Sequence, residues 1–244
     1  MSRFLDRVVI VTGAGSGIGQ HAAARFRDEG AQVVAVDVDP REVPDRTESV
    51  HADVTEPDDV RALMDDVVSR HGRVDILVNN AGVGSTTDLL GCTLSEWDRV
   101  FAVNVRGPFL CMQAVLPTML ERGRGVIVNV ASVAGLIGLR DRAAYCASKG
   151  ALIALTRQVA VQWADAGIRC NAVCPGTVDS PWVARLLAES PDPDLRRREL
   201  VARQPMGRLG RPDEIAQAIC YLASDAAAFM TGSELVIDGG ILAG

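Results

Sequence analysis

Hydrophobic positions along the chain follow two alternating patterns. Short runs of apolar, mostly β-branched residues predict strands that are buried on both faces, as in a parallel sheet. These runs lie at 7–12, 31–37, 74–79, 125–130, 168–173 and 234–238. The longer segments between them predict helices. The predicted helices lie at 17–29, 57–71, 95–121, 146–166 and 212–224.

Strand and helix alternate from one end of the chain to the other. This order is typical of an α/β fold with a Rossmann-type doubly wound parallel sheet flanked by helices. No linker, low-complexity tract or internal repeat divides the 244 residues. The sequence therefore predicts a single domain over 1–244.

Composition and charge narrow the possible functions. Hydrophobic residues make up 48% and charged residues 23% of the chain, which indicates a packed core rather than disorder. The formal net charge of −6 disfavours a nucleic-acid surface. The basic run from Arg196 to Arg198 lies among acids and is interpreted as a solvated helix face. We therefore expect no nucleic-acid partner.

The sequence carries no signal for a membrane, a secretory leader or a metal. It contains no uncharged apolar stretch of 18 residues, and its first residues run directly into a strand. The six cysteines form no C-x-x-C motif and have no histidine partner, although Cys170 and Cys174 could form half of a metal site. Reduced thiols are the favoured interpretation, so we expect a cytoplasmic protein with no membrane contact and no metal.

The turn after the first predicted strand is rich in glycine. The stretch VVIVTGAGSGIGQ fits the spacing T-G-x-x-x-G-x-G with Thr12, Gly13, Gly17 and Gly19. Glycine permits a tight turn and a close approach of ligand to backbone, and a helix N-terminus favours a pyrophosphate. A tight turn without a ligand would also use glycine. The position between a strand and a helix favours a dinucleotide site.

An aspartate at the end of the second predicted strand bears on the choice of dinucleotide. Asp37 lies 18 residues after Gly19, where a carboxylate can accept hydrogen bonds from the adenosine ribose and repel a 2′-phosphate. Position 16 is serine, and Val38 and Asp39 follow Asp37. NAD is therefore favoured over NADP, although an aspartate that only forms a turn would look the same.

The chain contains a single lysine, Lys149, four residues after Tyr145. Residues four apart on a helix share a face, so the ammonium and the phenol can point into one cleft. A cation about 4 Å away at an effective dielectric constant of about 20 favours the phenolate by at most about 4 kcal/mol, or about three pH units. This predicts a tyrosine that exchanges protons near neutral pH. Tyr/Lys pairs also occur in helices by chance.

Further polar residues lie near the ends of other predicted strands. Ser132 follows the strand at 125–130 and lies 13 residues before Tyr145, so its hydroxyl could bind a carbonyl oxygen beside the phenol. The sequence Asn79-Asn80-Ala81-Gly82 follows another strand, and Asn104 lies in the helix after it.

With these motifs the chain resembles the short-chain dehydrogenase/reductase family over nearly its whole length. The cofactor turn of the family is matched by 12–19, its nicotinamide-side motif by 79–82, and its catalytic tetrad, in order and spacing, by Asn104, Ser132, Tyr145 and Lys149. Two departures are small, because Ser180 stands where threonine is frequent and Cys146 follows the tyrosine. Neither changes the expected chemistry.

The resemblance implies an NAD-dependent enzyme that interconverts a secondary alcohol and a ketone by hydride transfer. Ser132 would orient the substrate oxygen, and Tyr145 would exchange the proton. Lys149 would lower the pKa of Tyr145 and hold the nicotinamide ribose, while Asn104 would position a water. The implied cofactor contacts are Gly13, Ser16, Gly17, Ile18, Gly19, Asp37, Asp53, Val54, Asn80, Ala81, Gly82, Tyr145, Lys149, Pro175, Gly176, Thr177 and Val178. The alternative of another class, a non-catalytic NAD-sensing protein, would typically lack the tyrosine or the lysine.

Substrate choice is expected to depend on a helical lid at about 178–210. The sequence of this segment resembles that of the branch that contains hydroxybutyrate and 2-keto-3-deoxy-L-fuconate dehydrogenases, which implies that the substrate is a small hydroxy or keto acid. Arg142, three residues before Tyr145, could present a guanidinium to a carboxylate, and Arg185 and Arg203 resemble the acid-binding arginines of that branch. A 3-oxoacyl-carrier reductase and a neutral polyol or sugar dehydrogenase remain alternatives, since arginine is frequent throughout the chain.

Members of the family are mostly tetramers, so the resemblance also implies a homotetramer. The predicted helix at 146–166 is apolar on more than one face, as expected if it packs on both the sheet and a neighbouring subunit. A buried core helix would show the same pattern.

Overall fold

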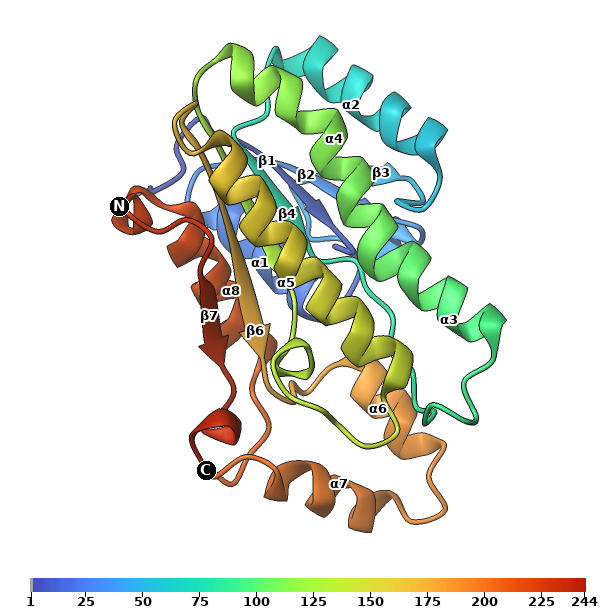
Figure 1. Ribbon diagram of the computed structural model, residues 1–244. Coiled ribbons are helices and arrows are strands. Elements are labelled where there is room, and N and C mark those ends of the chain that lie inside the picture. Colours follow the sequence, from blue (N-terminus) through green and yellow to red (C-terminus); the bar gives the residue numbers. More distant parts are fainter. Residues whose placement is uncertain (1) are drawn as a thin grey trace.

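The computed structural model describes residues 2–244, with the side chain of Arg41 excepted. Its described residues form one parallel sheet in the order β3-β2-β1-β4-β5-β6-β7 (Figure 1). The strands are β1 Val8–Thr12, β2 Gln32–Asp37, β3 Glu48–His51, β4 Ile76–Asn79, β5 Gly125–Val130, β6 Ile168–Pro175 and β7 Glu234–Ile237. The strand order reverses between β1 and β4, so a crevice opens between their carboxyl ends, where ligands bind in such folds.

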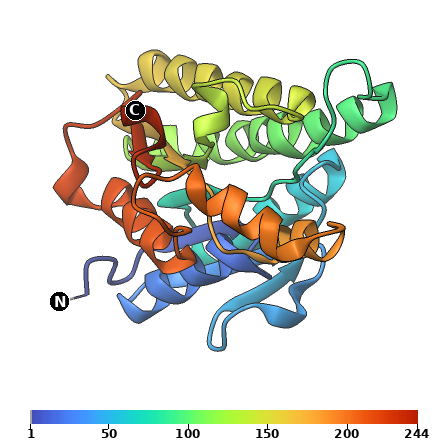
Figure 2. The same ribbon diagram turned by 90° about the horizontal axis from the view of Figure 1, so that it is seen from below.

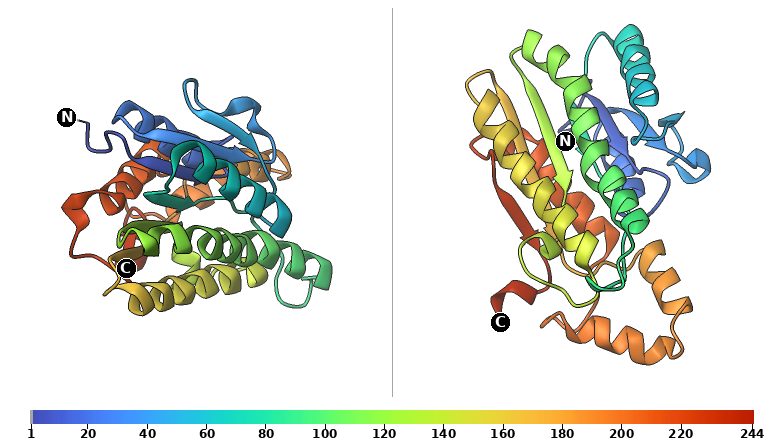
Figure 3. Two further views of the ribbon diagram at one scale, coloured as in Figure 1. Left: turned by 90° about the horizontal axis from the view of Figure 1, so that it is seen from above. Right: turned by 45° about the vertical axis from the view of Figure 1, so that its right-hand side comes forward.

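Helices cover both faces of the sheet (Figures 2 and 3). One face carries α1 (Gly17–Asp28) and α8 (Pro212–Ala223), which pack against each other. The other face carries α2 (Pro57–His71), α4 (Gly107–Glu121) and α5 (Ala143–Trp163). Short 3-10 helices lie at Pro40–Glu42, Val133–Gly135, Asp225–Ala227 and Ile241–Ala243. This is the predicted doubly wound fold.

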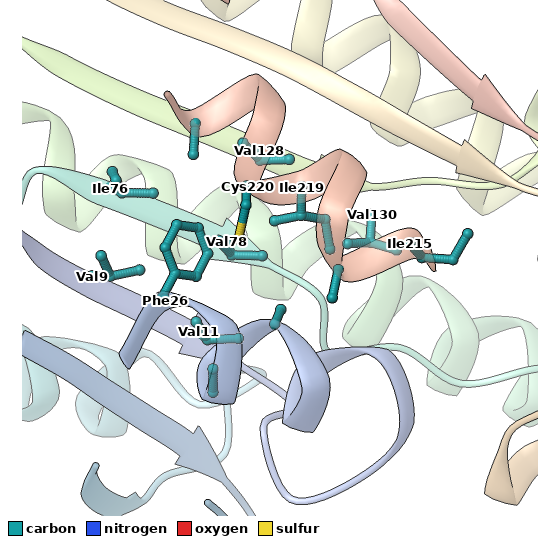
Figure 4. Packing of buried hydrophobic residues seen from close by; sticks show 14 of the residues in the cluster. Val9, Val11, Phe26, Ile76, Val78, Val128, Val130, Ile215, Ile219 and Cys220 are labelled. Atoms are coloured by element: carbon teal, nitrogen blue, oxygen red, sulfur yellow. The ribbon is translucent and has the colours of Figure 1, made fainter. Parts of the chain in front are cut away.

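The alternation of side chains along each strand creates two hydrophobic cores. Val9 and Val11 point to the α1–α8 face, where Phe26 and Ile219 pack on them (Figure 4). Their neighbours Val8 and Ile10 point to the opposite face, into a second core with α2 and α4. The strands are therefore buried on both sides, which explains their continuous apolar runs.

The six predicted strands are confirmed, but the sequence pattern missed β3 (Glu48–His51). This strand lies at the edge of the sheet, and β2 is its one partner among the described residues. Its four residues alternate between half-buried and exposed and include Glu48 and His51, so no apolar run marks it. Val50 is its one residue that packs on the second core, and it is only partly buried, so the strand depends mainly on its pairing with β2.

The predicted helices are present, and α2 has the predicted bounds of 57–71, while the bounds of the others differ. The segment predicted at 95–121 consists of α3 (Leu94–Phe101), a π-helical stretch at Ala102–Arg106, and α4. Helix α5 begins at Ala143 rather than at 146, which places both Tyr145 and Lys149 on it. The segment predicted as a helical lid contains two helices, α6 (Pro181–Ala188) and α7 (Pro193–Ala202).

One helical stretch in the described part of the chain, Leu94–Glu121, is long and apolar enough to cross a membrane by length and composition alone. This stretch lies along the sheet, and 44% of its most apolar 18-residue portion is buried. A core helix has the same properties.

A buried carboxylate lies among three arginines at the amino ends of the strands, on the side of the sheet away from the crevice. Asp75 is only 5% exposed and accepts a hydrogen bond from the backbone N–H of Val8 at 2.9 Å. Its carboxylate oxygens lie 3.1 Å from nitrogens of Arg73 and Arg122 and 3.6 Å from Arg7. The cluster therefore ties β1 and β4 to the end of α4.

Candidate active site

A cleft of about 440 Å³ opens at the carboxyl ends of β4, β5 and β6. Ser132, Tyr145 and Lys149 line it together with Arg142 and Arg203. Residues that are far apart in the sequence thus meet at the edge where the strand order reverses. Seven further predicted cofactor contacts line the other walls of the cleft: Ile18, Asn80, Gly82, Pro175, Gly176, Thr177 and Val178.

The glycine turn packs closely against the end of β4. Gly13 has a φ of 64°, and a Cβ there would lie 2.8 Å from the Cα of Ala81. A Cβ on Gly19 would collide with the carbonyl oxygen of Gly13. Ser16 is the N-cap residue of α1, but its hydroxyl accepts no hydrogen bond from the helix. The first N–H groups of α1 can therefore bind another acceptor. Gly17, with a φ of 54°, lies beside Ser180 and Pro181 at the base of α6.

A hydrogen-bonded clamp joins β1 to β4 beside this turn. The hydroxyl of Thr12 accepts hydrogen bonds from the backbone N–H groups of Asn80 and Ala81, both at 3.1 Å. The side-chain amide of Asn80 donates to the carbonyl oxygens of Thr12 and Gly13, both at 3.0 Å. The clamp holds the two sides of the crevice at a defined separation.

Two aspartates lie at the same edge of the sheet: Asp37 is the last residue of β2, and Asp53 lies just beyond the end of β3. The carboxylate of Asp37 accepts hydrogen bonds from the N–H of Gly15 at 2.8 Å and of Asp39 at 3.0 Å. Asp53 accepts one from the N–H of Thr55 at 2.8 Å, and the neighbouring Val54 is 7% exposed. The uncapped helix start, the glycine turn and these carboxylates fit the pyrophosphate and adenosine of a dinucleotide.

The loop after β6 forms the opposite wall. Gly176 has no room for a side chain, because a Cβ would lie 2.8 Å from the carbonyl oxygen of Asp238. The N–H of Thr177 donates to the side chain of Gln204 at 3.1 Å, and the carbonyl oxygen of Thr177 accepts from the N–H of Gly210 at 2.9 Å. These bonds attach the base of the α6–α7 segment to the cleft wall.

Tyr145 and Lys149 lie one turn apart on α5 and face the end of β5. The ammonium of Lys149 is buried and donates to the carbonyl oxygen of Val130 at 2.8 Å. It lies 5.7 Å from the centre of the Tyr145 ring. Ser132 is 7% exposed, and its hydroxyl accepts from the N–H of Ala134 at 3.1 Å. A substrate oxygen in the cleft can thus meet a hydroxyl, a phenol and a cation.

Burial dominates the electrostatics of this group. It raises the pKa of Tyr145 above its ordinary value, while the hydrogen bond with Ser132 and the charge of Arg142 lower it. Burial also lowers the pKa of Lys149 to about 8. The expectation that Lys149 brings the pKa of Tyr145 down is therefore not met in the structure, because the loss of water outweighs the neighbouring charges.

Asn104 lies behind these groups, in the π-helical stretch, with no exposed surface. Its amide donates to the carbonyl oxygen of Val83 at 2.9 Å and to the hydroxyl of Ser148 at 3.0 Å, and it accepts from the N–H of Val83 at 2.8 Å. Ser148 in turn donates to the carbonyl oxygen of Tyr145 at 2.8 Å. Ser148 was not among the predicted site residues, although a serine beside the lone lysine, on a face that must be buried, is a signal for such a contact.

The three arginines predicted to bind an acid occupy different environments. Arg142 is 5% exposed and Arg203 is half-buried, and both line the cleft. Arg185 is exposed and is not among the lining residues. Burial is the main cause of a lowered pKa at both Arg142 and Arg203, and the two cations and Arg196 add mutual repulsion. Among the residues that the structure describes, neither Arg142 nor Arg203 forms an ion pair, so this part of the cleft suits an anion.

Comparison with known proteins agrees with this geometry. A family model described as enoyl-(acyl carrier protein) reductase matches residues 13–242. The chain is 41% identical to 2-(S)-hydroxypropyl-CoM dehydrogenase 3 of Xanthobacter autotrophicus, over 99% of each chain. The chain belongs to the short-chain dehydrogenase/reductase family. Nicotinamide cofactors are general in this family, and its members act on small molecules.

The chain is similar to other members of the short-chain dehydrogenase/reductase family over nearly its whole length. Cis-4-hydroxycyclohexanecarboxylate dehydrogenase of Sinomonas cyclohexanicum is 42% identical, over 98% of each chain. The structure of aldohexose dehydrogenase from Thermoplasma acidophilum superimposes with a TM-score of 0.93 at 38% identity, covering 100% of this chain and 96% of that one. The fold and the reaction class, a secondary alcohol and ketone oxidoreductase, therefore follow from family membership.

Proposed function

We propose that the protein is an NAD-dependent dehydrogenase that interconverts the secondary alcohol and the ketone of a small hydroxy acid, including acids derived from sugars. The observation that carries this proposal is the presence of Arg142 and Arg203 in one cleft with Ser132 and Tyr145. A substrate carboxylate at the two guanidinium groups would leave its hydroxyl-bearing carbon facing the phenol.

The charge balance of the cleft supports an anionic substrate. Arg142 is buried and Arg203 is half-buried, and the charge of Arg203 helps to lower the pKa of Arg142. Neither guanidinium forms an ion pair among the described residues, so both are stabilised when an anion binds between them. The names of two relatives point the same way, since hydroxypropyl-CoM and cis-4-hydroxycyclohexanecarboxylate are both anions that carry a secondary alcohol.

The environment of Asp37 supports NAD rather than NADP. Its carboxylate lies within hydrogen-bond distance of the glycine turn, at 2.8 Å from the N–H of Gly15. A carboxylate at this place accepts ribose hydroxyls and repels a phosphate. The glycine turn and the start of α1 would hold the pyrophosphate, and the loops after β4 and β6 would flank the nicotinamide.

The remaining roles follow from the contacts of the side chains. When bound, the nicotinamide supplies the acceptor or donor of hydride. Ser132 holds the substrate oxygen, and Tyr145 takes the alcohol proton during oxidation or returns it during reduction. Below about pH 8 Lys149 holds a positive charge beside the phenol. Its side chain would also reach the ribose, while Asn104 and Ser148 fix the first turn of α5. Because the pKa of Tyr145 is raised, we expect oxidation to accelerate as the pH rises through the alkaline range.

The experiment is a comparison of matched alcohols with NAD at alkaline pH. Cis-4-hydroxycyclohexanecarboxylate and 3-hydroxybutanoate are each compared with their carboxamides, and an aldohexose and a 3-hydroxyacyl thioester, the alcohol form of the 3-oxoacyl substrate, test the two alternatives. We expect kcat/KM to favour each carboxylate over its amide by at least about tenfold, since a charge-assisted bidentate bond is lost in the amide. Equal turnover of acid and amide, or preference for the sugar or the thioester, would contradict the acid proposal. Tight NAD binding without any turnover would favour the NAD-sensing alternative.

The same proposal includes a cytoplasmic homotetramer. The groove between α4 and α5 has a volume of about 360 Å³ and an almost wholly apolar lining that includes Phe109, Leu116, Leu155 and Trp163. Phe109 is 45% exposed, and in the described part of the chain β7 pairs on one side alone, with β6. Burial of this groove against a second copy would remove apolar surface from water. Sedimentation of a lone 25.9 kDa species would contradict the tetramer.

A further inference from the structure

Trp182 is the large side chain that α6 contributes to the cleft, and its indole lies directly on Gly84. A Cβ on Gly84 would lie 2.5 Å from the Cζ2 atom of Trp182, which is closer than such atoms can approach. The φ angle of Gly84 is outside the left-handed region, so its backbone would accept any residue. Glycine at this position is therefore required for space alone, and the indole occupies that space.

The same indole also holds the buried cation of the cleft. The guanidinium carbon of Arg142 lies 5.1 Å from the centre of the Trp182 ring. The guanidinium also donates to the carbonyl oxygen of Ser85 at 2.9 Å, next to Gly84. The aromatic face thus fixes the orientation of a group that has no carboxylate partner among the described residues.

Three separate segments meet at this contact. The loop that carries Gly84 is held by Arg99, which donates to the Gly84 carbonyl oxygen at 3.1 Å, and by the N–H of Ala143, which donates to Thr87 at 3.1 Å. The α6–α7 segment has its own small hydrophobic cluster, formed by Val183, Leu200 and Leu209 with Trp182 against it. Trp182 is therefore the side chain through which this segment contacts both a fixed loop and the start of α5.

We propose that Trp182 determines specificity by holding the guanidinium of Arg142 in position for the anionic group of the substrate, with Gly84 as the surface on which the indole rests. The inference rests on the proposed function, in which the substrate is an acid. Trp182 acts through Arg142 and is a positioning residue. Its loss should weaken the discrimination between an acid and its neutral analogue, and should leave proton transfer at Tyr145 largely unchanged.

The test uses two ligands that need no turnover, cyclohexanecarboxylate and cyclohexanecarboxamide. Their dissociation constants are measured by calorimetry with saturating NAD for the wild type, Trp182→Leu and Gly84→Ala. We expect both variants to weaken binding of the carboxylate by about tenfold and binding of the carboxamide by less than about twofold, because the stacked cation is released. Trp182→Phe keeps an aromatic face and should recover part of the loss.

Two control variants separate this role from general damage. Leu187→Ala removes a side chain that packs on the same small cluster without lining the cleft. Gly138→Ala adds a methyl group where no atom lies within 4 Å. Both should bind the two ligands as the wild type does. If the wild type does not favour the carboxylate, the proposed function fails. If it does, and Trp182→Leu keeps that preference or loses affinity for both ligands equally, only the role of Trp182 fails.

Discussion

Replacement of Lys149 by methionine should abolish turnover and, at the same time, stabilise the fold. The pKa of Lys149 falls from 10.5 to about 8 because the side chain is buried. By linkage, keeping this ammonium charged costs the folded state about 3 kcal/mol at pH 7. Its hydrogen bond to the carbonyl oxygen of Val130, at 2.8 Å, returns about 1 kcal/mol. An unbranched apolar side chain removes both effects, so Lys149→Met should raise the free energy of unfolding by about 2 kcal/mol.

The pH dependence identifies the cause of this gain. Between about pH 8 and pH 10.5 the unfolded chain binds more protons at Lys149 than the folded chain does, so the wild type gains stability from this group as the pH rises. Below that window the charged lysine is present in both states and its full cost remains. The advantage of Lys149→Met should therefore be constant below pH 8 and disappear by about pH 10.5.

Urea unfolding at pH 7 and at pH 10, at one fixed protein concentration, measures both effects. Lys149→Arg is the matched control, because arginine stays charged at every pH used and its planar guanidinium cannot replace the compact ammonium that donates to the carbonyl oxygen of Val130. This variant should be no more stable than the wild type and should lose at least about 100-fold in turnover. A Lys149→Met variant that is less stable than the wild type at pH 7, or whose advantage is the same at pH 10, would refute the reasoning.

Three further predictions concern other positions. Tyr145→Phe should reduce turnover to background, while the dissociation constant for NAD, measured by fluorescence titration, should change by less than about threefold. Turnover above background in this variant would contradict the role of the phenol. The wild type should favour NAD over NADP by about 100-fold in kcat/KM, and Asp37→Ala should reduce that preference mainly by weakening the binding of NAD. Equal use of both cofactors by the wild type would overturn this expectation. Asp75→Asn should lower the free energy of unfolding by about 2 kcal/mol, because three arginines lose a buried carboxylate, and an unchanged urea midpoint would show that solvent already screens the cluster.

Local sequence patterns were sufficient to predict those parts of the molecule whose conformation depends on residues adjacent in the chain. The apolar runs predicted six strands because a strand buried on both faces needs no polar position, and the glycine spacing predicted the turn at Gly13 because only glycine tolerates its φ of 64°. The edge strand β3 was missed for the same reason, since it is stabilised by its pairing with β2 and carries no apolar run.

The sequence by itself thus determined the α/β order, the cofactor turn and the spacing of Ser132, Tyr145 and Lys149, because these depend on residues close together in the chain. Tertiary structure alone decided which arginines face the cleft, since Arg142 and Arg203 line it while Arg185 is exposed on α6. It also decided the direction of the Tyr145 pKa, which is raised because burial removes water from the phenol. Burial and distance between segments arise only when the chain is packed, and no spacing along the sequence contains them.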